Sequence, residues 1–454
     1  MRSVTVRSWV ILFASILAIG CKKESNTNSP VRGDIQTHAL NSEKDLDSLM
    51  LQIGNARVVL LGEASHGTSE YYNWRAAISK RLMQEKGFDA IAVEGEWADS
   101  YRVNNFIKGP KSDSAAAEKV LNNYNRWPTW MWGNYEIASL ITWMNAFNQT
   151  KSLADKVGFY GLDVYCLWES TQELMPYLQG ADPAVVSAAQ TMEQCFLPYS
   201  ANPDEYGNAV ANASTNCREQ TNNLWNGILK ITGDATATNE ADFVMQQNAL
   251  VALNGEQYYR ASVSSYSGSW NIRDRHMAQT IKRLLDFIGP DSKLIVWEHN
   301  THVGDARYTD MASQDLVNVG QLVREEFGQQ NVYAVGFGSY RGSVIASNTW
   351  GGAIINMPVP AAPANSWEGY LHSLSATNKI LFSAEIKNNT TLQGSIGHRA
   401  IGVVYNPNDE QGNYVPSIIP KRYDAFIYLD QTTALHPIEI SQRNEPPDTY
   451  PSGF

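Results

Sequence analysis

The sequence predicts an α/β protein in which a central, mostly parallel sheet is flanked by helices, with a helical insertion or subdomain. Six short, β-branched apolar runs end in polar residues or glycine, as is typical of central strands covered on both faces. Helical patterns separate several of these runs, and such alternation favours a parallel sheet. Residues 183–283 are rich in Gln, Asn and Ala and carry no strand signal, which indicates the helical subdomain.

The expected elements follow one another in a simple order. The apolar runs that predict strands are 57–62, 89–95, 157–163, 293–298, 331–336 and 423–430. Helical spacing is clearest at 69–86 and 136–148. Residues 340–420 contain Gly- and Pro-rich turns between short strand-like pieces, so we expect a hairpin region near the sheet edge. Residues 37–437 are then one domain, followed by a loosely ordered tail at 438–454.

The first residues of the chain predict export. Arg2 and Arg7 precede an apolar segment that is too short to span a membrane, which is typical of a signal peptide over 1–20. Residues 18–21 (AIGC) match a bacterial lipobox, so we expect Cys21 to be acylated and 21–36 to form a polar tether. The alternative is a plain signal peptide. A lysine after Cys21 favours the outer membrane, and the expectation is an exported, membrane-anchored lipoprotein.

Charge and cysteine content narrow the partners. The formal net charge is −11 and the pI about 5.3, which argues against nucleic acid as a partner because phosphates need a basic surface. In an oxidising compartment a Cys195–Cys217 disulfide is plausible, and Cys166 lies in an aromatic run typical of a buried thiol. Cys/His spacings typical of a metal site are missing from the sequence, so no cofactor is expected, although a metal stays an alternative.

Polar residues stand where the predicted strands end. In open α/β sheets ligands bind outside the carboxyl ends of the strands, so these side chains are the candidate site. A buried polar group there is costly unless it is paired. Each one also has a structural reading, such as a helix cap, an ion pair of Arg75 or a satisfied loop histidine. The residues in question are Glu63, His66, Arg75, Glu94, Asp163, His299 and His302.

Aromatic residues are abundant, with 13 Trp, 22 Tyr and 13 Phe. Several tryptophans lie close in sequence to the first two strand ends, three of them in WPTWMW at 127–132. Ligand sites are mostly apolar with a few placed polar groups. We therefore expect part of these side chains to form the core and part to line the cleft, with Trp97, Trp130, Trp132 and Asp163 as the substrate contacts.

The sequence resembles the erythromycin esterase family, whose members hydrolyse the macrolide lactone. The resemblance covers about 40–437 and is carried by GEASHGTSEYYNWR (62–75), AVEGEW (92–97), WPTWMWGNYE (127–136), FYGLDVY (159–165), NIRDRHMA (271–278), WEHNTHV (297–303) and residues 423–430. It implies a catalytic domain over 37–437 with the same sheet and with the helical subdomain over the active-site cleft. It also implies an active site of Glu63, His66, Arg75, Glu94, His299 and His302. Glu298 stands where the family pattern has a small residue such as Ala, a departure that alters the pocket or a histidine pKa.

The expected reaction is hydrolysis of a macrolide lactone such as that of erythromycin, which would confer resistance. A serine or cysteine elbow is missing from the sequence, so a histidine activates water, with His299 favoured slightly over His66 because it ends a strand. Glu63 or Glu94 orients that histidine, and Arg75 or a protonated histidine stabilises the oxyanion. Alternatives are metal-assisted hydrolysis through His66, His299 and His302, hydrolysis of another lactone or ester, and a non-catalytic lipoprotein that binds haem, metal or lipid.

Overall fold

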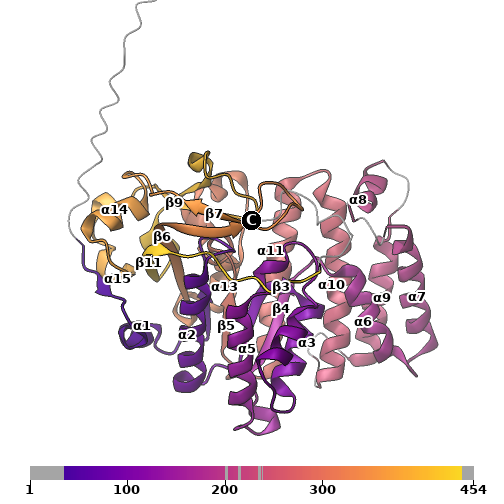
Figure 1. Ribbon diagram of the computed structural model, residues 1–454. Helices are drawn as coiled ribbons and strands as arrows, with labels where there is room; N and C mark the ends of the chain where they lie inside the picture. Colours follow the sequence, from indigo (N-terminus) through magenta and orange to yellow (C-terminus); the bar gives the residue numbers. More distant parts are fainter. Residues whose placement is uncertain (1–34, 200–202, 213–215, 234–236, 238, 442–454) are drawn as a thin grey trace, which may run out of the picture. The chain divides into compact units, whose positions relative to one another are not determined.

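The computed structural model describes residues 35–199, 203–212, 216–233, 237 and 239–441 of the chain (Figure 1). The predicted signal peptide, Cys21, most of the predicted tether and residues 442–454 lie outside the described residues. The described part is a mixed α/β fold with a mostly parallel central sheet flanked by helices, as the sequence predicts.

Eleven strands form two sheets among the described residues. They are β1 (His38–Ala39), β2 (Val58–Leu61), β3 (Ala90–Glu96), β4 (Gly158–Asp163), β5 (Leu294–Trp297), β6 (Val332–Ala346), β7 (Ile355–Val359), β8 (Lys379–Phe382), β9 (Ile396–Arg399), β10 (Tyr414–Ser417) and β11 (Ala425–Thr432).

The large sheet has the order β1-β8-β11-β6-β2-β5-β3-β4, and β7 pairs with β6. The run from β11 to β4 is parallel, whereas β8, β1 and β7 are antiparallel to their neighbours. All six strands that the sequence predicts are present, and they are the six parallel ones. Strands β9 and β10 form a separate antiparallel pair.

Sixteen α-helices lie between the strands in the described part of the chain. Their bounds are α1 (Asp47–Ile53), α2 (Ser69–Lys86), α3 (Trp97–Lys108), α4 (Ser114–Leu121), α5 (Tyr135–Asn148), α6 (Leu167–Leu174), α7 (Pro183–Phe196), α8 (Pro203–Ala211), α9 (Arg218–Thr232), α10 (Glu240–Ser262), α11 (Tyr266–Ile288), α12 (Asn300–Val303), α13 (Val319–Phe327), α14 (Trp367–Leu374), α15 (Ser383–Ile386) and α16 (Ile419–Arg422).

The two faces of the sheet bury separate apolar clusters, which explains the continuous apolar runs. In β2, Val59 and Leu61 belong to one cluster, and Val58 and Leu60 belong to the other. Side chains alternate across a strand, so a strand covered on both faces reads as apolar throughout. The helix predicted at 69–86 has these same bounds as α2, and it ends at Gly87, whose φ of 66° is the left-handed cap that glycine favours.

Strand β6 is much longer than the predicted 331–336. Its second half pairs with β7 as a hairpin, within the region where the sequence predicts one. The glycines of 336–342 lie beyond the predicted strand, but this stretch pairs in parallel with β11. Glycine is needed there for close packing, since a Cβ at Gly338 would lie 2.7 Å from the ring of Phe426.

The described residues of 183–283 are almost entirely helical, and α7, α9 and α10 lie side by side (Figure 1). Met192, Phe196 and Leu224 of this group belong to an apolar cluster that also includes Leu174 of α6. The helices that the sequence predicts in this stretch therefore pack around a second hydrophobic core.

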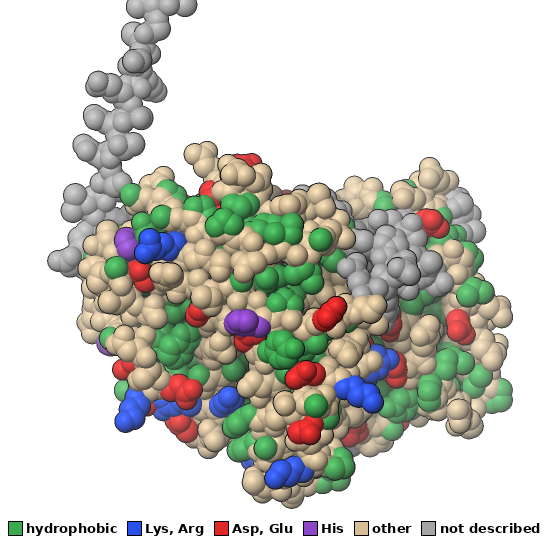
Figure 2. All heavy atoms as spheres, viewed as in Figure 1, with side chains coloured by type: hydrophobic (Ala, Val, Ile, Leu, Met, Phe, Trp, Pro, Cys, Tyr) green, Lys and Arg blue, Asp and Glu red, His purple; other side chains and the backbone are tan. Residues whose placement is uncertain are grey.

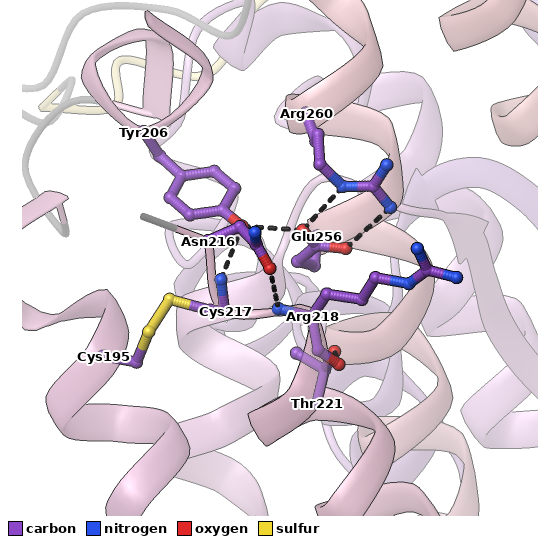
Figure 3. Close-up of a disulfide and its surroundings, with 8 residues drawn as sticks. All are labelled: Cys195, Tyr206, Asn216, Cys217, Arg218, Thr221, Glu256 and Arg260. Carbon is purple, nitrogen blue, oxygen red and sulfur yellow. Dashed lines mark hydrogen bonds and ion pairs between the residues drawn. A yellow bond between two sulfur atoms is a disulfide. The ribbon is translucent and has the colours of Figure 1, made fainter. Parts of the chain in front are cut away.

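The disulfide that the sequence suggests joins Cys195 of α7 to Cys217, the N-cap of α9 (Figure 3). Beside it the hydroxyl of Tyr206 donates to Glu256 at 2.6 Å and accepts from the backbone N–H of Cys217 at 3.0 Å. Cys166 is a buried free thiol, also as expected. The disulfide and these hydrogen bonds tie α7, α8, α9 and α10 together.

Charges of both signs share the surface. On the face shown in Figure 2, acidic and basic side chains lie next to one another, mainly over the lower half of the view. Among the described residues, no helix combines the length and the hydropathy needed to cross a membrane.

We predict that the disulfide contributes substantially to stability. The bond closes a loop of 22 residues, for which the loss of chain entropy in the unfolded state corresponds to about 3 kcal/mol. The double variant Cys195→Ser/Cys217→Ser should lose about this much in denaturant unfolding, and dithiothreitol should lower the stability of the wild type to the same degree. The control Cys166→Ala should keep its response to dithiothreitol. Identical unfolding of reduced and oxidised wild type would contradict the prediction.

Candidate active site

The loop between β2 and α2 carries the first group of candidate residues, and distant backbone holds it in place. The carbonyl of Gly67 accepts hydrogen bonds from the N–H groups of Ile345 and Leu435, both at 2.9 Å. The carbonyl of Ala64 accepts another from Ile401 at 2.8 Å. Loop 62–68 is thus fixed by three segments of the C-terminal third of the chain.

Glu63 joins the histidine and the arginine of this segment. Its Oε1 accepts from Nδ1 of His66 at 2.9 Å, and its Oε2 accepts from Arg75. Arg75 is fully buried and lies between the rings of Tyr72 and Trp297, with its guanidinium carbon 4.5 Å from each centroid. The arrangement Arg75–Glu63–His66 resembles the acid–histidine couple of hydrolases, in which the acid fixes the tautomer of the imidazole.

His299 follows β5 and lies directly beside His66, with ring centroids 4.9 Å apart. Its backbone N–H donates to Oε2 of Glu94 at 2.7 Å, and its Nδ1 lies 2.8 Å from the hydroxyl of Thr301. Burial lowers the pKa of His299 well below its ordinary value, and the neighbouring His66 adds to the effect. The neutral ring of His299 therefore packs against the ring of His66.

A second ionic network lies behind Glu94. Arg273 of α11 donates to Asp163 at 3.0 and 2.6 Å and to Glu94 at 2.9 Å. His302 lies 2.9 Å from Asp274 and 3.3 Å from Glu94. Burial alone would lower the pKa of His302, but Asp274 and Glu94 outweigh it and hold the pKa well above its ordinary value. His302 is thus a buried cation within this network.

Asn300 connects this region to another buried histidine. Its side-chain amide donates to the carbonyl of Phe337 at 2.6 Å and lies 3.1 Å from Nε2 of His398. Nδ1 of His398 in turn lies 2.6 Å from Glu368. The sequence analysis does not single out His398 or Glu368. Their role is to hold α12, and with it His299, against β6.

A cleft opens above these groups. It contains about 680 Å³ of space outside atoms, the open mouth included. It is a narrow cleft with aromatic walls. Its lining residues are His66, Glu94, Gly95, Glu96, Asp99, Tyr124, Arg126, Trp127, Pro128, Met131, Trp132, Asp163, Tyr165, Arg273, Trp350 and Val403.

The candidate polar residues lie close together in the structure. Of the three candidate tryptophans, only Trp132 lines the cleft. Trp132 and Asp163 line the cleft, as the sequence predicts. Trp97 is instead stacked between Tyr101 and Tyr160, 1% exposed. Trp130 is fully buried in the apolar cluster on the other face of the sheet. Because Trp97 and Trp130 face the core, their rings do not line the cleft.

Arg273 is the main site residue that sequence reasoning missed. It lies 110 residues from Asp163 and 179 from Glu94, so no local spacing links them. The sequence does contain one indication of this network, because Arg273 and Asp274 are adjacent charged residues within an otherwise amphipathic helix. Both residues are nearly inaccessible, and such charges are buried only when paired. Within the described residues, no group of three or more His, Cys, Asp or Glu side chains is arranged to hold a metal ion.

Glu298 is the unusual residue of this region. It is 1% exposed, and neither carboxyl oxygen has a hydrogen-bond partner. Burial raises its pKa well above the ordinary value of 4.5, and Glu94 and Asp274 oppose the lowering effect of His302. Glu298 is therefore a neutral carboxylic acid beside the ionic network.

This burial predicts a pH-dependent stability. As pH rises above 4.5, the unfolded chain releases the Glu298 proton while the folded chain keeps it. Wild type should then lose up to about 1.4 kcal/mol per pH unit through this group until its folded pKa is reached. Glu298→Gln lacks this loss, so its advantage over wild type should grow between pH 5 and pH 8 in urea unfolding. The exposed Glu193→Gln is the control. Parallel pH profiles of wild type and Glu298→Gln would contradict the prediction.

Comparisons with known proteins agree with this architecture. The family model described as erythromycin esterase matches residues 83–432. The erythromycin esterase type II of Escherichia coli is 21% identical over 371 residues, which are 77% of this chain and 86% of that protein. A Bacillus cereus protein of known structure superposes with a TM-score of 0.72 at 18% identity, over 89% of this chain and 97% of its own.

A mutant of the erythromycin esterase EreC, solved in its open conformation, superposes with a TM-score of 0.65 at 14% identity, over 88% of this chain and 98% of its own. At these identities the structural likeness shows the fold alone. The family match, however, spans most of the chain, and five of the seven motifs behind the sequence resemblance contribute residues to the cleft. The chain belongs to the erythromycin esterase family.

Proposed function

We propose that this protein is an esterase that hydrolyses the lactone of macrolide antibiotics with water activated by His66. Family membership supports a hydrolase at the coarse level. The observation that carries the finer proposal is the buried Arg75–Glu63–His66 arrangement, whose histidine lines the cleft.

His66 is better placed as the general base than His299, which the sequence slightly favours. Glu63 accepts the Nδ1 proton of His66, so Nε2 is left free to take a proton, and no described residue hydrogen-bonds it. Histidine is the side chain that most often acts as a general base, which suits proton transfer from water. His299 is not among the cleft residues, and its lowered pKa makes it a weak base. Its neutral ring instead orients His66.

The reaction follows from this placement. Nε2 of His66 removes a proton from a water molecule, whose oxygen attacks the ester carbonyl. The carbonyl π pair moves to oxygen, and collapse of the tetrahedral intermediate expels the alkoxide, which takes the proton back from His66. Arg273 lines the cleft and supplies a fixed positive charge for the oxyanion. Arg75 does not line it and instead anchors Glu63.

The cleft walls support a large apolar substrate. Five aromatic residues line it, beside six charged side chains and His66. Small-molecule sites combine apolar walls with placed polar groups. A macrolide is a large apolar ring with a single ester to cut. Its entry requires the narrow cleft to widen at the mouth.

We predict that His66→Ala and Glu63→Gln lower kcat by about a hundredfold or more, because general-base catalysis contributes on this order. The control is His372→Asn, which removes a histidine paired with Asp430 at 2.7 Å, outside the residues that line the cleft. Full esterase rates in both variants with an unchanged circular dichroism spectrum would refute the mechanism. Exhaustive chelation should leave the rate unchanged, whereas a loss that added metal restores would favour metal-assisted hydrolysis.

The substrate is tested directly. Incubation of the purified protein with 14- and 16-membered macrolides should produce species heavier by one water molecule, as seen by mass spectrometry, and His66→Ala should not produce them. A protein that binds these compounds without any mass gain would be a binding protein rather than an esterase. Turnover of simple esters but not of macrolides would mean that the protein hydrolyses another ester substrate.

A further inference from the structure

A second pocket lies where α3, α6 and α10 pack together (Figure 1). It contains about 340 Å³ of space outside atoms, the open mouth included. Helix α3 forms one wall, Glu173 and Tyr177 form another, and Val244 and Asn248 of α10 form the third. None of its lining residues lines the cleft at His66, so the pocket is separate from the proposed active site.

Asn248 provides the observation that points to a ligand. Its side chain lines the pocket and is 1% exposed, and its Oδ1 has no hydrogen-bond partner. Buried polar side-chain atoms nearly always have a partner, because leaving one unpaired is costly. A molecule that enters the pocket can supply the missing partner.

The hydrogen bonding of Asn248 determines which kind of group it needs. Its Nδ2 donates to the carbonyl of Val244, one turn earlier in α10, at 3.0 Å. Turning the amide over would place Oδ1 against that carbonyl, which is also an acceptor, so the unpaired atom is the oxygen. The ligand must therefore present an N–H or O–H group.

The walls of the pocket favour a flat ring. Trp97, Tyr101 and Tyr177 all line it. The faces of Trp97 are covered by Tyr101 and Tyr160, at 5.7 and 5.9 Å between centroids, so an entering ring meets the edge of the indole. Aromatic rings favour such edge-to-face contacts. Tyr177 is 36% exposed and offers an accessible ring to the same ligand.

The charged residues of the pocket already have partners. Arg102 donates to Glu173, and it also pairs with Asp99 at 2.6 Å. An anion in the pocket would meet Glu173 and a cation would meet Arg102, so either would have to compete with an existing ion pair. A neutral ligand leaves this pair intact.

We propose that this pocket is a second ligand site, which binds a neutral aromatic molecule through an N–H or O–H group. The donor lies on Oδ1 of Asn248, and the ring lies between Trp97 and Tyr177. Ala98 lines this pocket and the next residue, Asp99, lines the cleft, so the bound molecule contacts the same helix as the substrate. The proposal concerns binding and does not rest on the proposed esterase function.

The first experiment measures binding by calorimetry with two probes of the same shape, indole and benzofuran. Only indole carries an N–H group. We expect indole to bind at least about fivefold more tightly, since one buried hydrogen bond is worth about this factor. Equal affinity, tighter binding of benzofuran, or no binding of indole at millimolar concentration would overturn the proposal.

The second experiment locates the donor. Asn248→Leu keeps the size of the side chain and removes the acceptor, so it should weaken indole binding about fivefold and leave benzofuran binding unchanged. The matched control is Asn222→Leu, because the exposed Asn222 also donates to the carbonyl one turn earlier, that of Arg218, and lies outside the pocket. If Asn248→Leu folds, as judged by circular dichroism, and keeps the preference for indole, the assignment to this pocket is wrong.

The third experiment tests the wall of the pocket with a side chain whose removal is tolerated more easily. Tyr177→Ala removes a ring that is 36% exposed, and it should weaken the binding of both probes about fivefold while the preference for indole remains. The control Tyr135→Ala removes a ring that is 51% exposed outside the pocket, and it should bind both probes as wild type does. Wild-type affinity of Tyr177→Ala for both probes would contradict the proposal.

Discussion

Pairing of buried charge is the constraint on which this structure depends. Glu63, Arg75, Glu94, Arg273 and Asp274 are each no more than 3% exposed, and a bare ion at such depth would cost several kcal/mol. Each therefore has a partner of opposite sign. The pairs join the ends of different strands and α11, so electrostatic neutrality can be reached only when these elements are correctly assembled. Correct folding of the site and pairing of its buried charges therefore depend on each other.

The neighbouring charged groups also give three histidines different properties. His66 contacts the cleft and one carboxylate, His299 is kept neutral by burial, and His302 is held as a cation by Asp274 and Glu94. Identical side chains within a few ångströms thus differ in charge because their neighbours differ. Glu298 extends the pattern, as a carboxyl group whose pKa burial raises well above its ordinary value despite the lowering effect of His302.

The sequence carried much of this information because strands and their ends leave local signals. The apolar runs located the six parallel strands, and the polar residues that follow them meet at one edge of the sheet. Trp97 and Trp130 were harder, since an aromatic residue looks the same in sequence whether its ring faces a core or a cleft. Arg273 and His398 were hidden for another reason. Their partners lie far away along the chain, and only the folded arrangement shows which charges meet.

The anchoring of loop 62–68 has a consequence for the order in which the protein matures. Gly67 receives one of its hydrogen bonds from Leu435, and Ser69 donates to the carbonyl of Thr433, so the loop that presents His66 is completed by residues close to the C-terminus. Synthesis proceeds from the N-terminus. The hydrogen bonds of this loop with Thr433 and Leu435 can therefore form only after more than three hundred and fifty residues beyond His66 have been made. Until these residues have been made, the loop that presents His66 lacks two of its backbone hydrogen bonds.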